Sequence, residues 1–156
     1  MPWLLGCLIL LPAFGALACL LGAAARRILV GACVVVLATA AGGTVAAWQA
    51  LACGPLAAAE DWLRLDALSA YHLLILLLVF SSSSLYACSY FRREEAEGRF
   101  DAALARRFGS LWLGSLASMI LVLLSNNLGI LWVGIEAATL LTAFLICLHA
   151  TPASLE

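Results

Sequence analysis

Five long apolar stretches dominate this sequence and decide what the chain can fold into. A helix needs about 20 apolar residues to cross a hydrocarbon layer of about 30 Å, and each stretch is of that order. Hydrophobic residues make up 65% of the 156 residues and charged residues only 11%, a balance outside the range of soluble domains. We therefore predict an all-α integral membrane protein with a single membrane domain over residues 1–156. The expected helices cover residues 2–25, 28–51, 68–91, 108–124 and 128–148.

The arginines predict how this domain sits in the membrane. All eight cationic residues are arginine, and cytoplasmic loops of membrane proteins are enriched in such residues. Only Arg64 falls in a connection on one side, which is therefore taken as the outer side. The other side holds Arg26, Arg27, Arg92, Arg93, Arg99, Arg106 and Arg107. The N-terminus is thus expected outside and the C-terminus in the cytoplasm, with 92–107 as a charged cytoplasmic loop; a short interfacial helix there is the less favoured alternative.

Several classes of function are disfavoured by the composition. A net charge of −1 gives no reason to expect a nucleic-acid partner. The six cysteines are widely spaced without a C-x-x-C pair, so we interpret them as small buried hydrophobic residues rather than disulfides or metal ligands. No glycine-rich phosphate loop and no nucleophile with an adjacent base is present, so an autonomous enzyme, a cofactor or a metal is not expected.

One carboxylate, Glu136, lies within the apolar segment SNNLGILWVGIEAATLLTAFLI, which contains no cation. Eight residues into the fifth expected helix, it would lie about 12 Å below the interface. A charge at such a depth costs about 2.5 to 3.5 kcal/mol unless it is paired, protonated or hydrated. Two interpretations remain open: an ion-handling carboxyl group, or a structural acid hydrogen-bonded to another helix. On an ideal helix, the face of Glu136 also carries Gly129, Trp132, Val133, Leu140 and Ala143, and its small residues predict contact with a neighbouring helix.

The two histidines and two predicted helix caps complete the set of polar candidates. His72 is expected near the outer end of the third helix and His149 at the inner end of the fifth, so they cannot share one metal ion within this chain. Each is either a proton-pathway residue or a structural one. Asp66 is expected to cap the third helix, and the turn at 125–127 to end the fourth helix and cap the fifth. The hydroxyls at 81–84 are expected to bond to their own helix.

Two segments resemble a known family of membrane proteins. RLDALSAYHLLILLLVFSSSSLYACSYF resembles the third-helix signature of the antiporter-like proton-translocating subunits of respiratory complex I and related hydrogenases. The segment SNNLGILWVGIEAATLLTAFLI, followed by SLE, resembles the hydrogenase-4 component F branch. This resemblance implies a fold of about fourteen helices built from inverted repeats, of which this chain would be the first third. It also implies that Glu136 matches an essential glutamate coupled to a lysine on a later helix.

The expected function follows from this resemblance. The chain would belong to an ion-translocating membrane subunit, carrying H⁺ or Na⁺, of a hydrogenase-4-like or NADH:quinone oxidoreductase-like complex. Glu136 would be a buried proton-path carboxylate, with His72 and His149 as further positions on that path. The partners would be other membrane subunits in the inner membrane of a bacterium or archaeon. The alternatives are a structural or assembly module, a truncated remnant of such a subunit and, less favoured, an independent small transporter.

Overall fold

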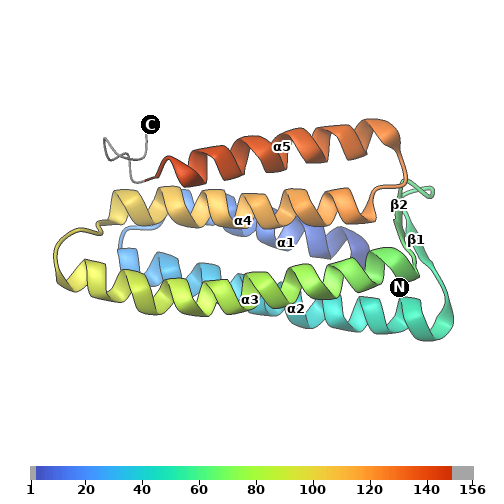
Figure 1. The fold of residues 1–156 in the computed structure, drawn as a ribbon, viewed down its shortest axis with the longest axis horizontal. Helices are drawn as coiled ribbons and strands as arrows, with labels where there is room; N and C mark the ends of the chain where they lie inside the picture. The colour runs from blue at the N-terminus through green and yellow to red at the C-terminus, as the bar shows by residue number, and fades with distance from the viewer. Residues whose placement is uncertain (1–2, 149–156) are drawn as a thin grey trace.

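Five helices form an elongated bundle in the computed structural model, which describes residues 3–148 (Figure 1). The helices are α1 (Trp3–Leu20), α2 (Ala25–Cys53), α3 (Ala67–Ala96), α4 (Ala102–Leu124) and α5 (Leu128–Ile146), and two strands, β1 (Leu56–Ala58) and β2 (Leu63–Leu65), lie between α2 and α3. All five helices are long and apolar enough to cross a membrane. The predicted number of spans is therefore confirmed for the part of the chain that the structure describes.

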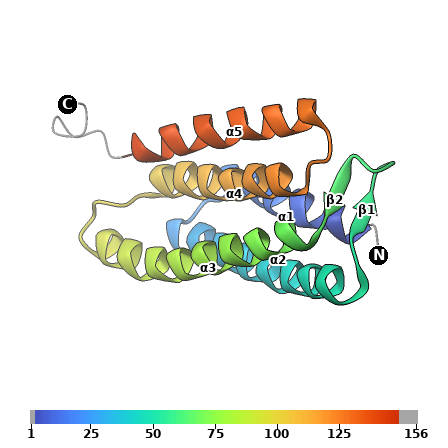
Figure 2. The ribbon, with the colours of Figure 1, turned by 45° about the vertical axis from the view of Figure 1, so that its right-hand side comes forward.

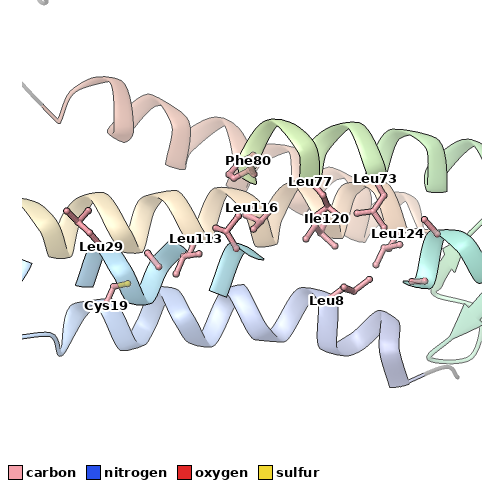
Figure 3. Close-up of a cluster of buried hydrophobic side chains, with 14 of the residues drawn as sticks. Leu8, Cys19, Leu29, Leu73, Leu77, Phe80, Leu113, Leu116, Ile120 and Leu124 are labelled. Atoms are coloured by element: carbon pink, nitrogen blue, oxygen red, sulfur yellow. The ribbon is translucent and has the colours of Figure 1, made fainter. Parts of the chain in front are cut away.

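Helix α4 is central to the arrangement. It packs against α1 on one side and α5 on the other and also touches α2, while α3 packs mainly on α2. In Figures 1 and 2, α5 lies on the outside of this assembly, along α4. The main cluster of buried hydrophobic residues, part of which Figure 3 shows, comes from the first four helices and the hairpin. Leu8, Leu73, Leu113, Leu116 and Ile120 are among its members.

The segment 92–107 is not a loop, as the sequence analysis favoured, because helix covers most of it. Helix α3 continues through Ala96 and α4 begins at Ala102, so only 97–101 connects them. The side chain of Asp101 caps α4 by accepting a hydrogen bond from the Leu104 backbone N–H at 2.8 Å, and Gly98 turns the chain with a φ of 72°. Arginine and glutamate are good helix formers, which explains why a charged segment extends the membrane helices.

A small β-hairpin lies at the opposite end of the bundle, where only a polar connection was expected. Strands β1 and β2 are antiparallel, with Leu56 opposite Leu65 and Ala58 opposite Leu63. Asn126, between α4 and α5, donates its backbone N–H to the Trp62 carbonyl at 2.9 Å. The fold is thus all-α in its membrane part only, and the hairpin ties the α4–α5 turn to the segment before α3.

Candidate functional site

The start of α5 is fixed by a side-chain cap. Asn127 Oδ1 accepts hydrogen bonds from the backbone N–H groups of Gly129 at 2.9 Å and Ile130 at 3.3 Å. Ser125 Oγ donates to the Asn127 carbonyl at 2.8 Å. The two bonds to Asn127 Oδ1 satisfy donors that a helix N-terminus otherwise leaves free. The predicted turn and cap at 125–127 are therefore confirmed, and α5 runs antiparallel to α4 (Figure 1).

The contact between α4 and α5 involves one glycine from each helix, Gly114 of α4 and Gly134 of α5. A Cβ atom on Gly134 would lie 2.8 Å from Val122 Cγ2, and one on Gly114 would lie 3.2 Å from Leu141 Cδ1. Gly134 and Leu141 are seven residues apart and therefore share one face of α5. Gly134 is the only buried residue of α5. Close backbone approach, rather than interlocking large side chains, joins this helix to the bundle.

Glu136 lies on the opposite side of α5. Two residues after Gly134, it is rotated by about 200° from the α4 contact, and its side chain is exposed. Around it, Trp132 is 64% exposed and Leu140 is 56% exposed. From the sequence, this face was expected to contact a neighbouring helix, but no described helix of this chain covers it. The prediction was made from small residues at helical spacing, which mark a helix contact only where a partner is present.

The carboxylate of Glu136 has no hydrogen bond or ion pair with any side chain or backbone group of residues 3–148. The nearby hydroxyl of Thr139 is already used, because it donates to the Ile135 carbonyl of its own helix at 2.8 Å. The described part of this chain therefore does not bury the carboxylate of Glu136. Burial of Glu136 would require another chain or segment beside α5.

His72 lies near the hairpin end of α3 and borders a groove between α3, α4 and α5. Its Nδ1 lies 2.9 Å from the Leu68 carbonyl, so Nδ1 carries the hydrogen of this bond and Nε2 of the neutral ring remains an acceptor. The groove has a volume of about 570 Å³, and Ile135 and Thr139 of α5 also line it. His72 thus shares a groove with two neighbours of Glu136. His149 lies outside the described residues.

The predicted cap at Asp66 is confirmed, whereas the bond to the same helix that was predicted for the hydroxyls at 81–84 is found for Ser82 and not for Ser84. Asp66 accepts a hydrogen bond from the Ser69 backbone N–H at 2.7 Å and caps α3. This bond lowers the pKa of Asp66, because it favours the charged carboxylate. Ser82 returns its hydroxyl bond to the Leu78 carbonyl at 2.9 Å. Ser84 instead accepts a bond from Trp112 on α4, at 2.8 Å, an interhelical contact that the sequence analysis did not predict.

The cysteines behave only partly as expected. Cys19 and Cys33 are buried, whereas Cys7, Cys53 and Cys147 are exposed, and all six thiols are free. In the described part of the chain, no group of three or more histidine, cysteine or acidic side chains could hold a metal ion. Cys7 on α1 and Cys53 on α2 are exposed on their helices, where lipid is as compatible with a small apolar side chain as a protein core is, whereas Cys147 lies at the C-terminal end of α5.

Comparison with known proteins gives one informative similarity. The chain is similar to a hydrogenase-4 component F homolog. That protein, from Methylacidiphilum infernorum (isolate V4), is 32% identical over 91 residues, which are 58% of this chain and 19% of the relative. The match thus spans about a fifth of the relative's length. No family model matches the chain, and no solved structure matches it significantly.

This similarity agrees with the resemblance found in the sequence at a coarse level. It supports a membrane protein that is similar, over part of its length, to hydrogenase-4 component F. The five helices that are long and apolar enough to cross a membrane also support a membrane protein.

Proposed function

We propose that this chain is part of an ion-translocating membrane subunit of a hydrogenase-4-like or NADH:quinone oxidoreductase-like complex, in which Glu136 takes up and releases a proton. One observation carries the proposal: a carboxylate lies at the middle of α5, a helix long and apolar enough to cross a membrane, on its exposed face and without a hydrogen-bond or ion-pair partner in residues 3–148. An acid in that position is costly unless it has a function or a partner. The similarity to a hydrogenase-4 component F homolog supports the choice of complex.

The chemistry of such a site depends on a cation from outside the described residues. The sequence contains no lysine, and α5 itself contains no arginine. Removal from water favours the neutral form of a carboxyl group, whereas a nearby cation favours the charged form. A neighbouring helix that brings a cation to the face of Glu136 and withdraws it would therefore change the proton occupancy of the carboxyl group.

His72 is a second position for this pathway. It lines the same groove as Ile135 and Thr139, which flank Glu136 on α5, and its free ring nitrogen can accept a proton. We propose that His72 passes protons between this groove and the side of the membrane at which the hairpin lies. His149 remains a prediction from the sequence.

The direct test replaces Glu136 with glutamine in the complete complex, reconstituted into vesicles of a native-like bacterial or archaeal membrane lipid mixture. Glu136→Gln keeps the shape and hydrogen-bonding capacity but cannot ionise, so we expect ion translocation to fall by at least about tenfold while the complex still assembles. His72→Gln should slow the same reaction less. The matched control is Glu60→Gln, in the exposed turn of the hairpin, which should leave the rate unchanged. Unaltered translocation by Glu136→Gln would disprove the proposed role.

A structural or assembly module is the second candidate, and the apolar outer face of α5 favours it. Trp132, Val133 and Leu140 are all largely exposed there, so a partner helix could dock against them. On this alternative, Glu136 only fixes the position of that partner through a hydrogen bond. Loss of assembly in Glu136→Gln, with intact folding of the isolated chain, would favour this second function.

A further inference from the structure

A cavity lies between α4 and the C-terminal end of α5, at the end of the bundle away from the hairpin. Its volume is about 380 Å³, and six of the described residues line it. They are Arg107, Ser110 and Leu111 from α4, and Phe144, Cys147 and Leu148 from the end of α5 and the turn that follows. We propose that this cavity binds an anionic phospholipid, with the headgroup phosphate at Arg107 and an acyl chain along Leu111 and Phe144.

The position of Arg107 fits the phosphate layer of a membrane. It precedes Leu124, the last residue of α4, by 17 positions, which corresponds to about 26 Å along a helix and nearly the full hydrocarbon thickness. Arg107 also lies on the α4 face that contacts α5, because Gly114 and Ser118 follow it at spacings of seven and eleven. The guanidinium therefore sits at the end of the α4–α5 seam rather than on an unrelated surface.

The charge of Arg107 is not balanced within the described chain. Arg64 and Arg99 form ion pairs, and Arg106 donates a hydrogen bond to the Gly22 carbonyl at 3.1 Å. Arg107 is exposed and makes no ion pair or side-chain hydrogen bond within residues 3–148. None of the six lining residues is acidic. A planar guanidinium without a partner is well suited to two parallel hydrogen bonds with a phosphate group.

The other lining residues select a lipid rather than a soluble phosphate compound. Leu111, Phe144 and Leu148 form an apolar wall, which a dissolved phosphate ester cannot use. Ser110 Oγ donates its hydrogen to the Arg107 carbonyl at 3.1 Å, so toward the cavity it can only accept a hydrogen bond. A headgroup with hydroxyl donors, such as that of phosphatidylglycerol, satisfies both Arg107 and Ser110. Basic pockets between membrane helices are known to bind anionic headgroups in this way.

The test measures lipid binding to the purified full chain in detergent by native mass spectrometry, with phosphatidylglycerol and phosphatidylcholine as probes. We expect phosphatidylglycerol to bind more tightly, and Arg107→Gln to weaken that binding about five- to tenfold. The matched control is Arg26→Gln, which removes the same charge at the same end of the bundle but does not line the cavity. It should change the affinity less than twofold. Equal weakening by the two variants would overturn the proposal, because it would show a general charge effect.

Two further measurements separate a lipid from a free phosphate ester. Phe144→Ala removes part of the apolar wall and should weaken phosphatidylglycerol binding although Arg107 is intact. Glycerol phosphate, which has the same phosphate chemistry without acyl chains, should not displace the bound lipid at millimolar concentration. Displacement by glycerol phosphate, or unchanged lipid binding to Phe144→Ala, would show that the acyl chain plays no part and that the lipid proposal is wrong.

Discussion

Trp112 on α4 donates its indole N–H to Ser84 Oγ on α3 at 2.8 Å, in the middle of both helices. The same indole packs against Phe80, with ring centroids 4.6 Å apart. Helix α3 makes few other contacts with α4. Together with the contact between the Phe91 and Phe108 rings, whose centroids are 4.7 Å apart, this hydrogen bond and ring contact join two helices that otherwise meet mainly through α2.

Ser84→Ala should destabilise the bundle, because it leaves the indole N–H without its acceptor in a setting where water cannot replace it. We expect a loss of about 1 kcal/mol in the free energy of unfolding, measured by denaturant titration in detergent. Ser82→Ala is the control, since the Ser82 hydroxyl bonds only to its own helix. A loss in Ser82→Ala as large as that in Ser84→Ala would contradict the interhelical role.

Asp66 should make stability depend on pH in the acidic range. The hydrogen bond from Ser69 lowers the pKa of Asp66 in the folded chain, so its contribution is present above the ordinary carboxyl pKa of about 4 and is lost as the pH falls through the lowered value. Asp66→Asn keeps a capping side chain but removes the charge. The melting temperatures of the unchanged chain and of Asp66→Asn should therefore differ at pH 7 and converge as the pH falls below the lowered pKa of Asp66. A constant difference at all pH values would refute this assignment.

Gly134→Ala should loosen α5 from α4. The added Cβ would lie 2.8 Å from Val122 Cγ2, and a valine methyl has little freedom to move away. Where no atom lies close to the new Cβ, replacing a helical glycine with alanine is stabilising by about 0.5 to 1 kcal/mol. Gly31→Ala, where nothing lies within 4 Å of the new atom, is the matched control. Thermal unfolding should show a lower midpoint for Gly134→Ala and a higher one for Gly31→Ala; equal gains in both would rule out the close contact.

The features that were predicted correctly from the sequence depend on local chemistry. Length and hydrophobicity are enough to identify a membrane span, and the caps at Asp66 and Asn127 use side chains that bond within three residues of their own position. These properties do not depend on which helix lies next to which. That independence explains why the five spans and both caps were predictable.

The exposure of Glu136 could not be predicted in the same way. In a soluble helix, apolar residues mark the face that packs, but lipid is as apolar as a protein core, so both faces of a membrane helix have the same composition. The packed face of α5 is marked by Gly134 and the exposed face includes Gly129, and both are the kind of small residue expected at a contact. The hairpin was missed because its strands are only three residues long and carry no clear alternation.

The separation of α5 from the core has a consequence for how the protein could respond to a proton. No residue of α5 belongs to the main cluster of buried hydrophobic residues in the described chain, and its N-terminal end is attached to the hairpin through Asn126. A small shift of α5 would therefore leave the packing of the other four helices unchanged and require only sliding along α4 at its glycine contacts. The helix that carries the ionisable group is also the one whose displacement disturbs the fewest interactions of the fold.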